Sequence, residues 1–419
     1  GVHIADVSHY VKPGTALDKE AYLRSTSVYL VDRVLPMLPE KLSNGLCSLR
    51  PNEDKLTFSA VFIFDQNDKI KERWFGKTII HSDRRFAYEE AQQIMDAGEG
   101  DFAEELKYLN RIAKRLRAVR FKKGAINFES DEVKFRLDEN GAPISMFVKE
   151  RKEAHLLIED FMLLANREVA TFVAKKAEGL PEIPYIYRIH DEPNMDKVED
   201  LARFAMELGF QMKINTPKEI AASYNRLAEA ALADPGLKML EPIAIRTMAK
   251  AAYSTENIGH YGLAFDFYTH FTSPIRRYSD VLAHRILEPN LMPEAFLRVK
   301  KDKLEEQCLH ISKQERCAME AERESVKYKQ VEFMEKHLGE IFEGFVSGIG
   351  ERGLFIELKD SRAEGMVSFD TMPEPYEFTG SRLRVRGAYT GKEIKMGDVV
   401  QVRVVSANLA KRQIEMQMA

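Results

Sequence analysis

Cysteine is scarce in this sequence, and the few that occur do not form a pattern. Among 419 residues there are 3 cysteines, at Cys47, Cys308 and Cys317, and no pair has CxxC spacing. An odd, scattered set argues against a disulfide framework or a zinc site. It is typical of a reducing compartment, so we expect a cytoplasmic protein.

Long apolar runs and an excess of one charge are also missing. No stretch approaches the roughly 20 apolar residues that span a bilayer, and the first residues, GVHIADVSHY, lack the basic start and apolar core of a signal peptide. We therefore expect no membrane contact. The 62 basic and 66 acidic residues leave a net charge of -4, so any attraction to nucleic acid must come from a local patch.

What is present has the composition of an ordinary globular protein. The hydrophobic fraction is 44%, the charged fraction 31% and the mean hydropathy -0.35. This length predicts two or three domains with real hydrophobic cores. The opening VHIADV alternates like the interior of a strand, yet no turn or cap precedes it, so we expect the chain to begin inside a domain.

Local patterns predict strands first and helices afterwards. A DQND turn joins TFSAVFIFD to KERWFGKTIIHS, which predicts a hairpin. AYEEAQQIMDAG and DFAEELKYLNRIAKRLRAVRF predict two helices, and Leu157, Phe161 and Leu164 mark a third. Another amphipathic helix should begin at Glu192-Pro193. Residues 300–336 contain no Pro or Gly, which predicts one or two long helices.

The sequence changes character at about Leu338. Short β-type runs separated by glycines follow: GEIFEGFVSGIGERGLFIEL, EGMVSF, SRLRVRGAY and GDVVQVRVVSANLAKRQIEMQ. Five short strands in this space predict a small closed barrel of the OB type. The expected fold is α+β, with a helix-rich domain around a central sheet over residues 1–337 and an all-β barrel over residues 338–419.

The segment HYGLAFDFYTHFTSPIRRYSDVLAHRIL carries the most chemistry. Ser273 as N-cap and Pro274 as first helical residue predict a helix that places Arg276 and Arg277 in its first turn. The helix dipole disfavours cations there, and a bound phosphate would reverse that penalty. The alternative is that these arginines form ion pairs with Asp280 and neighbouring acids.

This segment closely resembles the signature of the RNase II and RNase R family, whose catalytic domain is called RNB. Further matches occur in the same order along the chain: HIADVSHYV, VLPMLPEKLSNGLCSLRP, GAINFES and HLLIEDFMLLAN. The tail is similar to the OB-type RNA-binding module that follows this domain in RNase R. The resemblance therefore covers nearly the whole chain.

The resemblance implies a processive, hydrolytic 3′→5′ exoribonuclease that uses Mg²⁺ to release nucleoside 5′-monophosphates from single-stranded RNA. Two-metal hydrolysis needs several oxygen ligands. In the family an aspartate cluster just upstream of the strand matching VHIADV supplies them, and this sequence begins after that point. Asp6 lies in the matching strand but is not a principal ligand in the family. The metal ligands thus remain unknown, and we expect the chain alone to be inactive.

Several site residues carry over from the family by position. Arg276 matches the arginine on the scissile phosphate, where it would offset growing negative charge. Glu322 matches a glutamate near the active site, although on so charged a helix it could equally be a solvated residue. Arg277 is expected to assist in binding RNA. Glu159 matches a ribose contact that would distinguish RNA from DNA. The alternatives are an ordinary surface pair or a metal pair with His155, which lies four residues earlier on the same helix face.

Aromatic residues carry over as base-stacking groups. Tyr88 and Phe128 match the two that sandwich the 3′-terminal bases, a sequence-tolerant contact. Both could instead be core residues. Tyr29 matches a tyrosine that limits the length of the end product, although its neighbourhood looks helical and a buried packing role is the alternative.

In the barrel, Phe342, Phe345 and Phe355 are candidates for stacking, and Arg384 belongs to the alternating set Arg382, Arg384 and Arg386, which would share one strand face. Some of the phenylalanines must also fill the core. The expected partner is single-stranded RNA rather than DNA, and the expected state is a monomer. A non-catalytic RNA-binding or regulatory protein on a degraded RNB scaffold is the alternative from another functional class.

Overall fold

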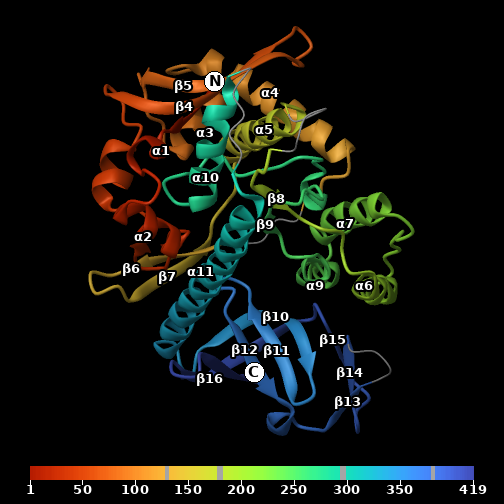
Figure 1. Cartoon of the computed structure of the whole chain (residues 1–419). Helices are drawn as coiled ribbons and strands as arrows, with labels where there is room; N and C mark the ends of the chain where they lie inside the picture. Colours follow the sequence, from red (N-terminus) through yellow and green to blue (C-terminus); the bar gives the residue numbers. More distant parts are fainter. Residues whose placement is uncertain (128–131, 177–182, 293–298, 379–382) are drawn as a thin grey trace.

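The computed structural model describes residues 1–127, 132–176, 183–292, 299–378 and 383–419 (Figure 1). A helix-rich part with a small sheet occupies the upper half of the view, and a β-barrel occupies the lower half. One long helix, α11, connects the two. The predicted α+β class with a closed barrel is confirmed.

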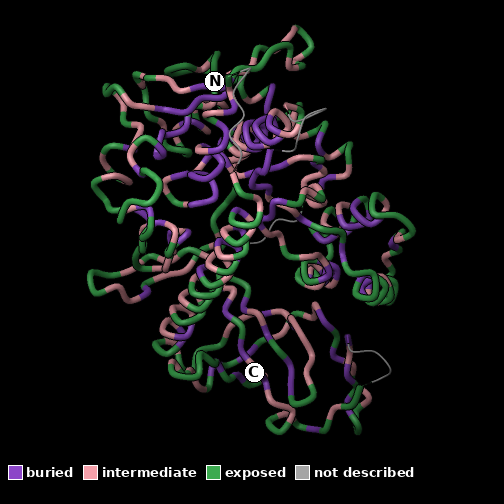
Figure 2. The backbone as a smooth tube through the Cα atoms, in the orientation of Figure 1, coloured by how far each residue is buried: buried purple, intermediate pink, exposed green. Residues whose placement is uncertain are grey.

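The upper sheet contains the predicted hairpin. Strand β4 (Asp54–Phe64) pairs antiparallel with β5 (Ile70–His81), and β1 (Val2–Ala5) adds to the other side of β4. Phe58 and Ala60 of β4 are fully buried in the main core. Figure 2 shows buried residues along this sheet and the helices next to it.

Three helices follow the hairpin and pack on one another. They are α3 (Tyr88–Ala97), α4 (Ala103–Lys122) and α5 (Glu153–Lys176). The first two lie where the sequence predicts them. The stripe predicted for the third is confirmed in part, since Leu157 and Leu164 of α5 are buried and Phe161 is partly buried.

A helical insertion has a core of its own. It comprises α6 (Met195–Glu207), α7 (Pro217–Ala231), α8 (Pro235–Lys238) and α9 (Glu241–Thr247). Helix α6 begins at Met195 and not at Glu192-Pro193, because the Asn194 side chain caps it by accepting the Lys197 N–H at 3.1 Å.

Residues 300–336 form a single helix, α11 (Lys301–Glu335), in place of the one or two predicted. Its first half buries Leu304, Cys308 and Ile311 in the main core. Its last turns bury Val331 and Met334 in the barrel core. The helix thus ties both cores together.

The predicted closed barrel is confirmed. Its strands are β10 (Ile341–Gly350), β11 (Gly353–Leu358), β12 (Glu364–Ser368), β16 (Val399–Asn408) and β17 (Gln413–Met418), and β10 pairs with β16 to close the ring. The stretch SRLRVRGAY is not part of the barrel: its strand β14 (Arg384–Gly387) pairs with β13 (Tyr376–Phe378) and β15 (Glu393–Lys395) in a separate sheet.

Shorter elements complete the described chain: α1 (Val7–Tyr10), α2 (Ala16–Arg24), β2 (Val28–Tyr29), β3 (Val34–Leu35), β6 (Val133–Leu137), β7 (Pro143–Val148), β8 (Tyr187–Ile189), β9 (Ala252–Ser254) and α10 (Tyr278–Leu287). Within the described ranges, no helix is both long enough and apolar enough to cross a bilayer. Cys47, Cys308 and Cys317 are all free thiols.

Candidate functional site

A buried carboxylate holds the loop that precedes α10. Asp280 is fully buried, and its Oδ1 accepts the backbone N–H of Ser273 at 2.7 Å. The Arg277 guanidinium donates to both oxygens of Asp280, each at 2.8 Å. Burial alone would lower the pKa of Arg277, but the charge of Asp280 outweighs it and raises that pKa. Arg277 is therefore a permanently charged brace for this loop.

Helix α10 begins at Tyr278, so the prediction that it begins at Pro274 is wrong. Arg276 and Arg277 form a turn by donating their backbone N–H groups to the Ser273 carbonyl at 3.2 and 3.0 Å. The N–H of Tyr278 donates to the Ser25 carbonyl at 2.8 Å. Pairing with a distant segment thus replaces the helical turn that the local sequence favours. Both arginines lie before the helix and not in its first turn.

The two neighbouring arginines differ in their surroundings. Arg277 has the partner that the alternative interpretation named, Asp280. Arg276 is exposed, and its guanidinium has no hydrogen-bond or ion-pair partner among the described residues. Only Arg276 is therefore free to bind an anion without first breaking an internal ion pair.

Hydrogen bonds bring the segments of Arg276, Tyr29 and Glu322 together. The carbonyl of Arg276 accepts the Ser27 N–H at 3.0 Å. Two residues on, the Tyr29 N–H donates to Oε1 of Glu322 on α11 at 2.9 Å. Glu322 is thus more than a solvated side chain. The structure joins three predicted site residues that are far apart in the sequence.

Tyr29 lies in a strand and is accessible. It belongs to β2, not to a helix, and is 46% exposed. The expected helical neighbourhood and the buried packing role that followed from it are both wrong. Pairing between β2 and β3 and the hydrogen bond to Glu322 set this conformation, and neither is visible in the local sequence.

A layer of aromatic and charged groups, of which Tyr253 is buried and the others half-buried, lies in the same part of the fold and was missed by the sequence analysis. The Tyr253 hydroxyl is 2.6 Å from Nδ1 of His270, and Arg188 donates to Glu315 at 2.6 Å. The Arg188 guanidinium lies 4.6 Å from the centre of the Tyr253 ring. Burial lowers the pKa of His270 well below its usual value, so this imidazole is neutral. One indication of this layer is present in the sequence: His270 lies inside the segment that resembles the family signature.

Tyr88 stands at the start of α3 with its ring against a histidine of α5. It is 43% exposed, so it is no core residue. The rings of Tyr88 and His155 stack at 4.1 Å between centroids and 15° between planes. One face of Tyr88 is therefore covered, and a base would stack on the other.

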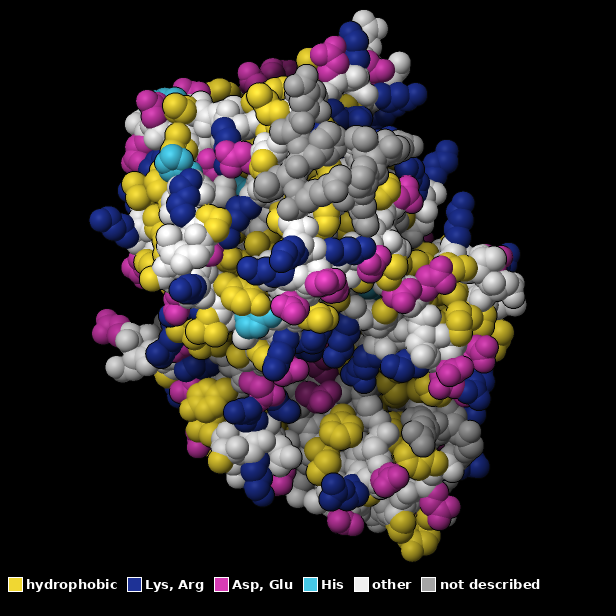
Figure 3. All heavy atoms as spheres, viewed as in Figure 1, with side chains coloured by type: hydrophobic (Ala, Val, Ile, Leu, Met, Phe, Trp, Pro, Cys, Tyr) yellow, Lys and Arg dark blue, Asp and Glu magenta, His cyan; other side chains and the backbone are white. Residues whose placement is uncertain are grey.

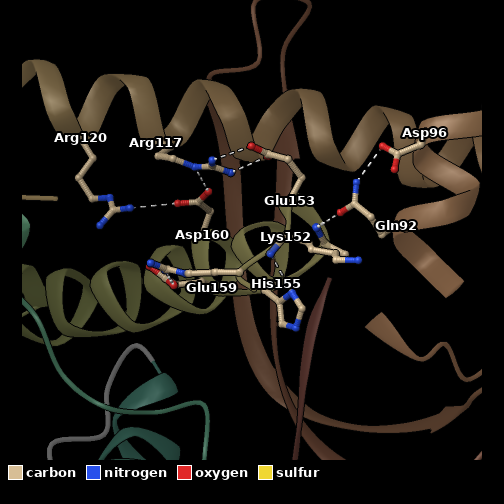
Figure 4. A network of polar contacts seen from close by, with 11 residues as sticks. Gln92, Asp96, Arg117, Arg120, Lys152, Glu153, His155, Glu159 and Asp160 are labelled. Carbon is tan, nitrogen blue, oxygen red and sulfur yellow. Dashed lines mark hydrogen bonds and ion pairs between the residues drawn. The ribbon is translucent and has the colours of Figure 1, made fainter. Parts of the chain in front are cut away.

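Glu159 lies one helical turn after His155 on the same helix. Figure 4 shows the side chains of Glu159 and His155 on α5. The carboxylate of Glu159 forms an ion pair with Arg151. Glu159 is thus in a surface pair, but its partner is Arg151 and not the expected His155. A ribose hydroxyl that reached Glu159 would share this carboxylate with Arg151.

A charged cluster beside these residues fastens α4 to α5 (Figure 4). Arg117 donates to Asp160 at 2.9 Å and to Glu153 at 3.2 Å, and Arg120 donates to Asp160 at 3.3 Å. Asp160 is buried, and burial raises its pKa despite these cations. The cluster holds the start of α5, and with it His155 and Glu159, at a fixed place.

The barrel candidates fall into different environments. Phe342 packs against the barrel core, and Phe345 packs in a cluster with Met239, Leu383 and Met396. Phe355 is 38% exposed. The core-filling role expected for some of these rings thus falls to the first two. Phe355 remains the accessible ring.

The basic stripe of the barrel region is present in part. Arg384 and Arg386 flank the buried Val385 in β14 and share one face. Arg384 lies 3.9 Å from Glu393 of the adjacent strand. Arg382 and Phe128 lie outside the described residues. Figure 3 shows basic and acidic side chains together at the junction between the barrel and the upper part.

No metal centre can be assigned. Within the described ranges there is no group of three or more His, Cys, Asp or Glu side chains that could hold a metal ion. Asp6, which follows β1 and caps α1 and so is not in the strand as expected, is bonded to Lys77 at 2.5 Å and to Ser8 at 2.8 Å. The described residues therefore do not form a site that fits Mg²⁺.

Comparison with known proteins gives a consistent result. The model of the RNB domain matches residues 1–293. Ribonuclease R of Aquifex aeolicus is 38% identical over 100% of this chain and 59% of its own length, and ribonuclease R 1 of Lactococcus lactis is 38% identical over 99% of this chain and 51% of its own length. The chain thus spans between half and three fifths of these relatives.

A solved structure agrees over the full described fold. RNase R of Mycoplasma genitalium, in complex with ribose-methylated single-stranded RNA, superimposes with a TM-score of 0.90 at 28% identity, over 100% of this chain and 66% of that one. With the RNB model matching residues 1–293, the chain belongs to the RNB-domain family.

Proposed function

We propose that this chain forms the greater part of a 3′→5′ exoribonuclease that hydrolyses single-stranded RNA processively and releases nucleoside 5′-monophosphates. Family membership and the ribonuclease R relatives support this activity. The observation that carries it is Arg276: an exposed guanidinium without a partner among the described residues, on a braced loop joined to the segment of Tyr29 and Glu322.

Each candidate side chain then has a role in the proposed reaction. Arg276 contacts the scissile phosphate and stabilises the charge that grows there. Tyr88 and Phe128 stack on the terminal bases, and Glu159 accepts a ribose 2′-OH. Tyr29 limits the end product, with Glu322 holding its backbone. In the barrel region Phe355 and Arg384 bind the incoming RNA, and Phe342 and Phe345 support them by packing in the hydrophobic clusters.

Mg²⁺ belongs to this proposal as the cofactor of the longer protein. When bound, it would activate water and stabilise the leaving oxygen. Because the described residues offer no such site, we infer that the chain alone binds RNA without cleaving it. A monomer that works in the cytoplasm, with RNA rather than DNA as substrate, completes the proposal.

The test compares this chain with the full-length product of its gene on a 5′-labelled RNA of about 20 nucleotides. We expect the full-length protein with Mg²⁺ to give a ladder that ends at a few nucleotides, and chelation to abolish it. If neither form cleaves and both bind RNA with and without chelator, the non-catalytic RNA-binding alternative takes its place.

A single substitution tests the role of Arg276. Arg276→Ala in the full-length protein should lower kcat by about 10²-fold, as removal of one donor to a developing charge does, while RNA affinity changes far less. Arg203→Ala, at an exposed arginine of α6, is the matched control and should leave kcat unchanged. An equal loss in both variants, or none in either, contradicts the role of Arg276.

A further inference from the structure

A groove lies where α11, the segment after β2, strand β6 and the barrel meet. Its volume is about 760 Å³. Its walls come from residues 29–31, from β6, from the middle of α11 and from the barrel residues Arg362, Glu364 and Ile414. Figure 1 shows β6 beside α11 and the barrel below them. A volume of this size suits a small organic ligand.

Two cations of α11 line this groove. Arg323 and Lys327 are both exposed and are spaced i, i+4, so their side chains are neighbours on the helix. Neither has a hydrogen-bond or ion-pair partner in the part of the chain that the structure describes. Like charges at this spacing repel each other, and a bound phosphate would turn that repulsion into two charge-assisted contacts.

The other walls offer what a nucleoside needs. Phe135 of β6 and Met319 and Val326 of α11 provide apolar surface for a base. Glu322 lines the same groove, and its Oε1 is anchored by the Tyr29 N–H at 2.9 Å. Two further carboxylates line the groove, but Lys134 pairs with Glu132 and Ser347 donates to Glu364. Carboxylates beside the two cations disfavour a bare anion and favour a ligand that also brings hydroxyl donors, such as a ribose.

The groove also adjoins the candidate reaction centre. Tyr29 lines it, and the Ser27 N–H, two residues earlier, donates to the Arg276 carbonyl at 3.0 Å. The Val31 N–H donates to Ser325 Oγ at 3.0 Å, which fastens this wall to α11. A product released beside Arg276 would meet this groove next.

We propose that the groove is a site for a nucleoside 5′-monophosphate, which holds the released product with its phosphate between Arg323 and Lys327. That the ligand is a reaction product rests on the proposed exoribonuclease function. That the groove binds a nucleotide rests on its lining residues, chiefly Arg323, Lys327 and Glu322.

Calorimetric titration of this chain with AMP tests the site, with adenosine and inorganic phosphate as partial ligands. We expect AMP to bind at least about tenfold more tightly than either part. Arg323→Gln with Lys327→Gln should weaken AMP by at least about tenfold. Lys303→Gln with Lys313→Gln makes the same charge change at exposed positions of the same helix outside the groove, and should leave AMP affinity unchanged.

The site is contradicted if both double variants lose the same AMP affinity, or if AMP and inorganic phosphate bind equally tightly. It is also contradicted if the chain binds single-stranded RNA but does not bind AMP. The last result leaves the proposed exoribonuclease intact. Conversely, AMP binding that needs Arg323 and Lys327, in a protein whose full-length form neither binds nor cleaves RNA, supports the nucleotide site while the exoribonuclease proposal fails.

Discussion

At the scale of single residues, the buried ion pair between Arg277 and Asp280 holds the loop that precedes α10. Replacing Arg277 with Gln leaves the fully buried Asp280 without its cation. Because an uncompensated buried charge is costly, Arg277→Gln should lower the free energy of unfolding by about 3–5 kcal/mol. Denaturant unfolding followed by circular dichroism measures this loss.

An exposed ion pair provides the control for this prediction. Arg203 forms an exposed ion pair with Asp200 on the surface of α6. Arg203→Gln should cost less than about 0.5 kcal/mol, since solvent screens such pairs. If Arg277→Gln costs as little as this, Asp280 is not the brace of the loop. Adding Asp280→Asn to Arg277→Gln should restore part of the loss, because the unpaired charge is then removed.

Two glycines at the element scale set the contact between the barrel and the helical insertion. Gly397 has φ +87°, and a Cβ there would lie 2.6 Å from the backbone Cα of Gly236 in α8. Gly397 lies in the turn between β15 and the barrel strand β16, and its N–H donates to the carbonyl of Val346 of β10. Gly397→Ala should therefore separate this turn from α8 and cost about 1–3 kcal/mol beyond the strain of its backbone. Hydrogen exchange should show faster exchange in both the turn and α8.

Gly391 separates backbone strain from the loss of this contact. It also has a positive φ, +67°, but the nearest atom to a Cβ there is the side-chain Nε of Arg386 at 3.6 Å. Gly391→Ala should cost only the backbone strain of alanine at positive φ and should leave hydrogen exchange in α8 unchanged. Equal effects of the two substitutions would show that the Gly236–Gly397 contact does not hold the barrel.

The whole molecule responds to pH through three enclosed histidines, of which His284 is fully buried and His260 and His270 are half-buried. Burial lowers the pKa of His260 to about 3 and of His284 to about 4, and that of His270 well below its usual value. In the unfolded chain these imidazoles bind a proton near pH 6.5, whereas in the folded chain they stay neutral at that pH. Their contribution to stability is present above that pH and is lost as the pH falls towards the folded pKa values.

We expect the free energy of unfolding to fall by up to about 1.4 kcal/mol per pH unit for each of these histidines below pH 6.5. Denaturant unfolding at several pH values between 7.5 and 5 measures the slope. His81→Gln, at an exposed histidine, should leave the slope unchanged. A flat profile over this range would contradict the burial of neutral imidazoles.

The sequence by itself determined the features that depend on local chemistry. Residues 300–336 lack Pro and Gly, so nothing interrupts α11, and the DQND turn between two β-type runs is sufficient for the β4–β5 hairpin. The alternation of Arg384, Val385 and Arg386 predicts which residues share one face of β14, although the sheet that holds this strand is set by its partners β13 and β15. The family-like segments led to the RNB domain in the same way, since they are read from the residues alone.

Only the tertiary structure decided the features that depend on distant partners. Tyr278 begins α10 because its N–H donates to Ser25, and Arg277 is taken by Asp280 while Arg276 stays exposed. Tyr29 is accessible because Glu322 of α11 holds its backbone. Propensity and periodicity describe neighbours along the chain, whereas these contacts form between segments that folding brings together, so no local pattern contains them.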